Sequence, residues 1–158
     1  MAVEIQSRPF EPGDIDGAIL VIAATNQAEV NSAVISESRK RGILCNDAAT
    51  SECGDFVVPS TAHRGEFILA VTTSGASPAF SKRVRDQLLV QFGPEYGEFV
   101  GLLRELRADV LHNVSDAAQR HEILSKAAED DFAIQLIRDG QIQEARDRLF
   151  KCISTSPV

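Results

Sequence analysis

The stretch at residues 67–78 constrains the fold more than any other part of the chain. Its sequence, FILAVTTSGASP, starts as an apolar strand, passes through small and hydroxyl residues, and ends in a Ser-Pro pair. Ser77 is placed to cap a helix with Pro78 at its first position, and apolar residues then recur at helical spacing up to Gly93. Such a turn leaves N–H groups and hydroxyls at a helix N-terminus, where a carboxylate or phosphate binds readily.

Strand patterns and helix patterns alternate along the first two-thirds of the chain. The run at residues 18–24 is continuously apolar, as buried parallel strands are. Thr25 or Asn26 then caps a helix that ends before Gly42. Further strands are predicted at residues 43–45, 56–58 and 66–73, with an earlier short one at residues 3–6. This alternation of strands and helices is typical of βαβ units, so we predict an α/β fold with a partial Rossmann-like, mainly parallel sheet.

From Pro94 onward the pattern is entirely helical. An apolar stripe from Phe99 to Val114 predicts one long helix, Ser115 caps the next, and two shorter helices follow. We therefore divide the chain into a sheet domain at residues 1–93 and an all-helical dimerisation and C-terminal domain at residues 94–158. The stripe packs either inside its own domain or against a second subunit.

Composition excludes several classes of function. The net charge of −7 disfavours binding to a nucleic-acid backbone. We find no signal peptide and no apolar run long enough to cross a bilayer, so we expect a cytoplasmic protein without a membrane partner. Three scattered cysteines and the absence of an HxxxH or HExxH spacing predict no protein metal site.

Three stretches, in the same order and at similar separations, resemble the precorrin-2 dehydrogenase family found in siroheme synthases. Residues 20–26 with Val30 and Asn31 are similar to the family's LVIAATDD…LN. Residues 41–46 and 55–60 look like RGILVNVVDDPELCDFIFPA, and residues 72–88 resemble ISTGGASPVLARRLREEL. With weaker similarity toward the C-terminus, the resemblance covers nearly the whole chain.

The resemblance implies an enzyme that oxidises precorrin-2 to sirohydrochlorin with NAD, in some members with a ferrochelatase activity that yields siroheme. It implies a homodimer and a tetrapyrrole substrate rich in carboxylates. The site residues that it implies fall into two groups. The cofactor would lie beside Ala24, Thr25 and Asn26, and the substrate beside Asn46, Thr72, Thr73, Ser74 and Ser77.

The chain departs from the family pattern at the cofactor. Family members carry a Gly-rich turn that holds the pyrophosphate, and this chain has no GxGxxG or similar glycine cluster. Met1 corresponds to a point near the family's third strand, so we expect the main NAD anchor to be missing. The strand at residues 18–24 would then lose neighbours, which favours unfolding or pairing with another chain.

A second departure concerns catalysis. The family's aspartate, proposed as general base and chelatase residue, stands three positions after the asparagine that matches Asn46, and that position is Ala49 here. Asp47 lies on the same face as Ala49 if the segment is extended. Asp47 is either the proton acceptor or a solvated loop residue. The alternative to a dehydrogenase is accordingly a non-catalytic module that binds a tetrapyrrole or mediates dimerisation.

Overall fold

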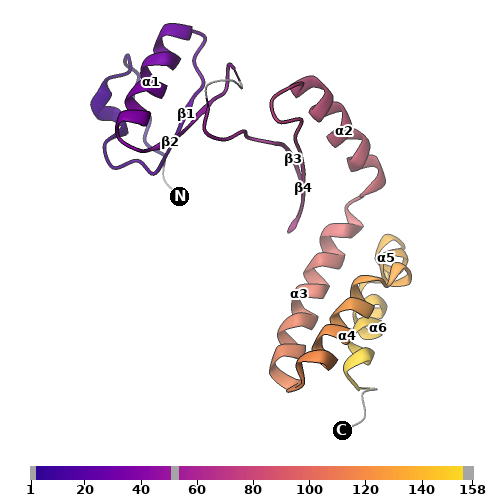
Figure 1. Ribbon diagram of the computed structural model, residues 1–158. Coiled ribbons are helices and arrows are strands. Elements are labelled where there is room, and N and C mark those ends of the chain that lie inside the picture. The colour runs from indigo at the N-terminus through magenta and orange to yellow at the C-terminus, as the bar shows by residue number, and fades with distance from the viewer. Residues whose placement is uncertain (1–2, 51–53, 155–158) are drawn as a thin grey trace. The chain divides into compact units, whose positions relative to one another are not determined.

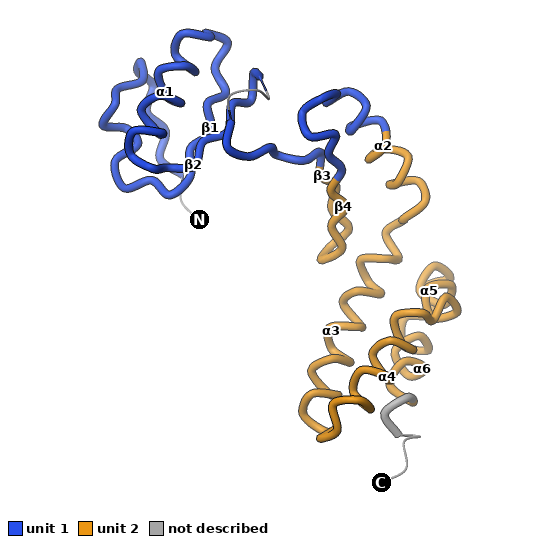
Figure 2. The backbone as a smooth tube through the Cα atoms, in the orientation of Figure 1, with its two compact units in different colours: residues 1–60, 71–83 blue, residues 61–70, 84–158 orange. Residues whose placement is uncertain are grey.

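The computed structural model describes residues 3–50 and 54–154, which form two compact units (Figures 1 and 2). One unit comprises residues 1–60 and 71–83, and the other comprises residues 61–70 and 84–158. The elements in chain order are the 3-10 helix η1 (Pro12–Ile15), β1 (Leu20–Ala23), α1 (Ala28–Lys40), β2 (Leu44–Asp47), β3 (Ser60–Arg64), β4 (Phe67–Val71), α2 (Pro78–Gln91), α3 (Glu95–Asn113), α4 (Ala117–Ala128), α5 (Asp131–Arg138) and α6 (Ile142–Ser154).

A parallel strand pair and one helix form the core of the first unit. β1 and β2 pair in parallel, with Leu20 opposite Leu44 and Ala23 opposite Asp47. α1 connects the two strands and covers one face of the pair, which makes a βαβ unit. The core consists of Ala23, Val34, Ile35 and Cys45, with Phe10, Val21 and Val30 packed against it. The predicted α/β class is therefore confirmed, although the strands form two separate pairs.

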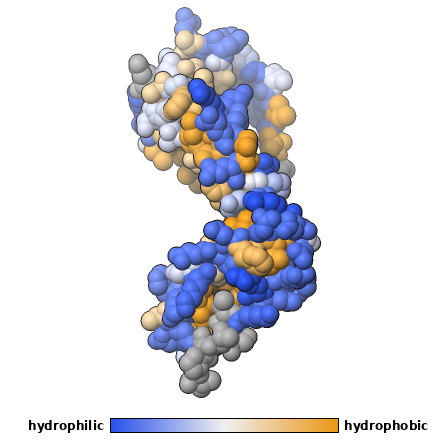
Figure 3. All heavy atoms as spheres, turned by 90° about the vertical axis from the view of Figure 1, so that its right-hand side faces the viewer, coloured by the Kyte–Doolittle hydropathy of each residue, from blue (hydrophilic) through white to orange (hydrophobic). Residues whose placement is uncertain are grey.

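The opposite face of the β1–β2 pair carries exposed apolar side chains. Leu20, Ile22 and Leu44 are each at least half exposed. Parallel strands are usually covered on both faces, whereas this face of the β1–β2 pair is open in the described residues. Apolar residues also form separate patches within the mostly hydrophilic surface drawn in Figure 3.

Two of the predicted strands are wrong. Residues 3–6 are exposed and form no strand. Residues 56–58 also lie outside the strands. There the Asp55 N–H donates to the Cys45 carbonyl over 2.7 Å, but Val57 and Val58 are exposed and belong to no strand. β3 is not predicted from the sequence, because its residues, STAHR, contain no apolar run.

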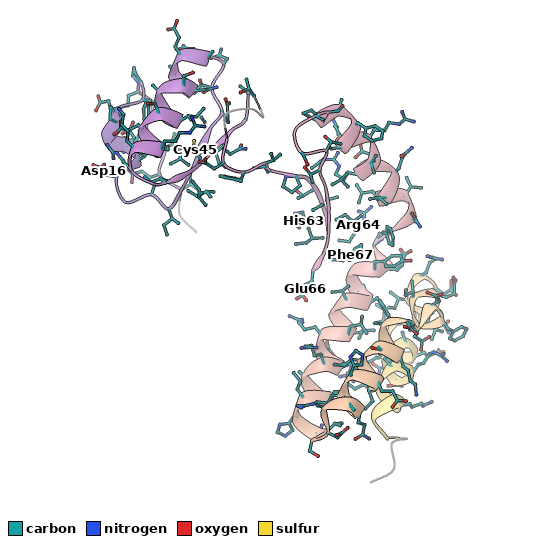
Figure 4. The ribbon with its side chains drawn as sticks, in the orientation of Figure 1. Asp16, Cys45, His63, Arg64, Glu66 and Phe67 are labelled. Atoms are coloured by element: carbon teal, nitrogen blue, oxygen red, sulfur yellow. The ribbon has the colours of Figure 1, made fainter. Side chains whose placement is uncertain are left out.

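β3 and β4 form a hairpin whose tip belongs to the second unit. Two residues connect the strands, and Gly65 has a positive φ of 58°. Figure 4 marks Arg64 and Glu66 beside this turn. The tip packs closely on the first turn of α3, since a Cβ on Gly97 would lie 2.4 Å from the Arg64 carbonyl oxygen. An ion pair of 2.7 Å between Glu66 and Arg104 adds a second contact.

The second unit has a helical core. Leu106, Val110 and Leu149 are fully buried at its centre. The buried set also contains Phe99, Leu102, Ile123, Ala127, Ala133, Ile134, Leu136, Ile137 and Ala145. The central residues of the predicted stripe on α3 therefore face their own unit.

Two helix caps differ from the prediction by one or two positions. Gln27, and not Thr25 or Asn26, precedes α1, and Thr25 instead accepts the Gln27 N–H with its hydroxyl. Asp116, and not Ser115, caps α4, because its carboxylate accepts the Gln119 N–H over 2.8 Å. The predicted cap of α2 is confirmed, since the Ser77 hydroxyl accepts the N–H of Phe80.

Candidate functional site

The carboxyl ends of β1 and β2 lie side by side, because the strands are parallel and in register. Ala23 pairs with Asp47, and the Ala48 N–H donates to the Ala23 carbonyl oxygen over 2.9 Å. In open α/β sheets, ligands bind beyond this edge. Residues 24–26 and Asn46, which the family resemblance assigns to the cofactor and the substrate, both lie there.

A groove opens beside the end of β2, and we call it the β2 groove. It consists of two adjoining cavities of about 570 and 210 Å³. The walls come from the end of β2 with its following loop, from the segment that leads into β3, and from the turn that leads into α2. The described lining residues are 46–50, 57–60, 71–73, Gly75, Pro78 and Ser81.

Asp47 is the one titratable residue among the described residues that line the β2 groove. It is 8% exposed. Its Oδ1 atom accepts the N–H groups of Ala49 at 2.9 Å and Thr50 at 3.2 Å, and its Oδ2 atom accepts the Thr50 hydroxyl at 2.8 Å. These donors, the Thr50 hydroxyl above all, hold the pKa of Asp47 below its ordinary value. The carboxylate is therefore ionised at neutral pH.

The segment after Asp47 is not extended, contrary to the assumption made from the sequence. The strand ends at Asp47 and the chain bends at Ala48 and Ala49. Asp47 and Ala49 nevertheless both line the groove. The bend places the N–H groups of Ala49 and Thr50 on the Asp47 carboxylate.

Asn46 links β2 to the segment at residues 54–56, which follows the loop after β2. Its Nδ2 atom donates to the Phe56 carbonyl oxygen over 2.6 Å, and the Asp55 carboxylate accepts the Cys45 N–H over 2.8 Å. Gly54 fits between these groups, since a Cβ there would lie 3.0 Å from the Asp47 nitrogen. The loop that carries Asp47 is thus anchored at both of its described ends.

The turn before α2 supplies hydroxyl groups to its wall of the β2 groove. Thr72 and Thr73 line the groove, whereas Ser74 and Ser77 do not. The Thr73 hydroxyl accepts the Ser77 N–H over 2.9 Å and lies 3.1 Å from the hydroxyl of Ser81. Positive φ angles of 53° at Ser74 and 86° at Gly75 shape this turn.

Sequence reasoning missed several groove residues. Thr50 carries no motif, and the apolar pattern around Val57 and Val58 predicts a buried strand. Ser81 had a detectable signal, because it stands one helical turn after the cap residue Ser77 and its hydroxyl donates to the Ser77 carbonyl. The structure brings five of the predicted residues to this groove, namely Asn46, Asp47, Thr72, Thr73 and, as the family position, Ala49.

A separate cavity, of about 760 Å³, lies at the start of α1, and we call it the α1 cavity. Thr25 and Asn26 line it together with Gln27, and Ala24 does not. The Thr25 turn is held by Asn31, which is 2% exposed. Its Oδ1 atom accepts the N–H and the hydroxyl of Thr25 at 3.0 and 2.6 Å, and its Nδ2 atom donates to the Thr25 carbonyl at 3.1 Å.

At the α1 cavity, the positive charge of Arg8 is compensated by a neighbouring carboxylate. Arg8 lines the cavity and donates to the Asp14 carboxylate. The same contact lowers the pKa of Asp14, with the Glu11 N–H as a smaller cause. Glu29 adds a negative charge in the first turn of α1.

Within residues 3–50 and 54–154, no three His, Cys, Asp or Glu residues are grouped closely enough to hold a metal ion. Over the same part of the chain, none of the helices is both long and apolar enough to cross a membrane.

Comparison with known proteins finds several that are similar to the chain. Residues 1–60 match a family model described as NAD(P)-binding. The chain is 34% identical to the precorrin-2 dehydrogenase of Methanosarcina barkeri over 90% of its own length and 62% of that protein's. It is 32% identical to the siroheme synthase of Methylobacillus flagellatus, over 92% of the chain and 31% of that protein. In sequence, the chain is thus similar to precorrin-2 dehydrogenases and siroheme synthases.

A solved structure supports the fold of the chain. The chain superimposes on SirC, a precorrin-2 dehydrogenase, with a TM-score of 0.71 and 24% identity, covering 92% of the chain and 70% of SirC. The chain spans less than two-thirds of the Methanosarcina protein and about a third of the Methylobacillus protein.

Proposed function

We propose that this chain takes part in the NAD-dependent oxidation of precorrin-2 to sirohydrochlorin in siroheme biosynthesis. The observation that carries the proposal is the placement of Asp47. It is the one charged residue among the described lining residues of the β2 groove, and it stands at the carboxyl edge of a parallel strand pair. This arrangement occurs in a chain that resembles a precorrin-2 dehydrogenase over nine-tenths of its length.

The oxidation removes a hydride and a proton from the tetrapyrrole. We assign the proton to the Asp47 carboxylate, because it is ionised at neutral pH and lies on the groove wall. Thr72 and Thr73 are assigned to the acid groups of the substrate, since hydroxyls donate hydrogen bonds to carboxylates. Ser74 and Ser77 lie in the same turn, and we place them at its outer rim.

The residues around Thr25 and Asn26 fit part of a dinucleotide. Hydroxyl and amide groups line the cavity, and the cap residue Gln27 makes no side-chain hydrogen bond to the first turn of α1. Arg8 is engaged by Asp14 and Glu29 is acidic, so this cavity suits an uncharged part of the cofactor better than its pyrophosphate. The bound cofactor would supply the hydride acceptor.

Iron insertion is the second activity implied by the family. The described residues hold no cluster of metal ligands. We therefore propose that any iron would be held mainly by the nitrogens of the tetrapyrrole, with Asp47 as the nearest charged group of the groove. Iron is in this case a substrate and not a resident cofactor.

We also propose a homodimer formed through α3. Leu111 on this helix is 49% exposed, and a Cβ on Gly101 would meet nothing within 4 Å. Both residues lie away from the side of the helix that forms the core of the second unit. Analytical ultracentrifugation of the chain and of Leu111→Glu tests the proposal, and an unchanged sedimentation coefficient in the variant contradicts it.

The decisive experiment measures turnover of precorrin-2 with NAD by the 158-residue chain, followed by the absorbance of sirohydrochlorin. Asp47→Asn is expected to lower kcat by about 10²-fold or more, as the loss of a positioned proton acceptor does. Asp109→Asn, an exposed aspartate on α3, serves as the matched control. Equal turnover by the wild-type chain and Asp47→Asn would exclude the acceptor role. Binding of sirohydrochlorin without any turnover would support the alternative, a tetrapyrrole-binding module.

A further inference from the structure

The hydrogen bonds that described residues donate to the Asp47 carboxylate can be counted against its acceptor positions. A carboxylate offers about four acceptor positions, two on each oxygen. The N–H groups of Ala49 and Thr50 occupy both positions on Oδ1, and the Thr50 hydroxyl occupies one on Oδ2. Among the hydrogen bonds that the described residues 3–50 and 54–154 make, one acceptor position therefore remains, and it belongs to Oδ2.

Thr50 supplies two of these three hydrogen bonds. Its side chain and its main chain both donate to the same carboxylate, at 2.8 and 3.2 Å, so it fixes both oxygens at once. Thr50 and Asp47 also line the β2 groove side by side. A residue that holds a groove carboxylate in this way controls which of its atoms faces a ligand.

We propose that Thr50 is a positioning residue for Asp47, which leaves one acceptor position on Oδ2 for a hydrogen-bond donor of the ligand in the β2 groove. The class of ligand rests on the proposed function, because the pyrrole-type N–H groups of a tetrapyrrole are donors of this kind. The described groove residues around Asp47 are uncharged. Among the described groove residues no other side chain carries a charge that would hold the carboxylate instead.

The first test needs no ligand. Carbon-13 NMR of the 158-residue chain measures the pKa of Asp47 in the wild type, Thr50→Val and Thr50→Ser. We expect the wild-type pKa below the ordinary aspartate value of about 3.9, a higher pKa in Thr50→Val, and the wild-type behaviour in Thr50→Ser. Thr61→Val, at an exposed threonine of β3, is the matched control. Should the Thr50→Val protein fail to fold, Thr50→Ala makes the same comparison.

The outcomes of the titration decide the positioning role. A wild-type Asp47 that titrates like free aspartate overturns the proposal, as does a Thr50→Val protein whose Asp47 titrates like the wild type. Neither outcome depends on whether the chain oxidises precorrin-2. Failure of the positioning role is therefore distinguishable from failure of the proposed function.

The second test uses sirohydrochlorin as the probe. Asp47→Asn keeps an oxygen for the N–H groups of Ala49 and Thr50 but turns the free acceptor into an NH₂ donor. We expect its affinity for sirohydrochlorin to fall about 10-fold or more, as for a lost hydrogen bond to a charged group, and that of Thr50→Val to fall less. Thr50→Ser is expected to bind as the wild type does. Equal affinity of Asp47→Asn and the wild type would refute the acceptor position on Oδ2.

Discussion

The contact between the hairpin tip and α3 leads to a sharp prediction for stability. A methyl group on Gly97 would lie 2.4 Å from the Arg64 carbonyl oxygen and 2.8 Å from its carbon, and both atoms are main chain. These distances are far below van der Waals contact, so the hairpin or the helix must move. Overpacking of this kind costs about 1–3 kcal/mol.

Helix propensity acts in the opposite direction at the same position. Alanine favours the helix over glycine by up to about 1 kcal/mol, and by less in the first turn. We therefore expect Gly97→Ala to lower the free energy of unfolding by about 1–2 kcal/mol. Gly101→Ala isolates the propensity effect, because a Cβ at Gly101 meets nothing within 4 Å one turn further along the same helix.

Urea unfolding followed by circular dichroism in the far ultraviolet measures the difference. Gly101→Ala should be more stable than the wild type by about 0.5–1 kcal/mol, and Gly97→Ala less stable, with the same dependence on urea in both. A Gly97→Ala protein as stable as Gly101→Ala would refute the close packing of Arg64 on α3. The Arg64 label in Figure 4 marks the position of this contact.

Single side chains lead to three further predictions. Leu106→Ala should destabilise the second unit by about 2.7–5 kcal/mol, because the side chain is fully buried and leaves a cavity, and thermal unfolding measures this. Asn31→Ala should cost about 1–3 kcal/mol in urea unfolding, since it removes the three hydrogen bonds that the buried Asn31 side chain makes to Thr25. Arg138 lowers the pKa of Glu95, so this pair stabilises the fold above the unfolded value of about 4.3 and the stabilisation is lost as pH falls through the lower folded value. In Arg138→Met the loss of stability on acidification from about pH 6 to about pH 3, measured by urea unfolding, should be smaller.

Local patterns predicted most of the elements correctly. The cap at Ser77, the breaks at Gly93 and Gly140, and the apolar stripe on α3 depend on residues close together in the chain, and the structure contains all of them. Residues 56–58 were misread for the same reason. An apolar triplet resembles a buried strand, but whether it pairs depends on a neighbour that no local pattern identifies.

The candidate site was partly predictable. Asn46, Asp47, Thr72 and Thr73 were named from motifs, and the structure brings them to one groove. The partners of Asp47 were not predictable. A threonine three residues after an aspartate is common, and only the bend after β2 turns its hydroxyl and N–H onto the carboxylate.

The amino-acid sequence by itself determined the α/β class, the helical second half and the family resemblance, because periodicity, caps and motifs are local properties of the chain. Tertiary structure alone decided where the charge in the groove is held. The pairing of Ala23 with Asp47 places the strand ends together, and the bend at residues 48–49 brings two N–H groups to Oδ1 and the Thr50 hydroxyl to Oδ2. Hydrogen-bond geometry depends on the path of the backbone in space, which residue spacing does not specify.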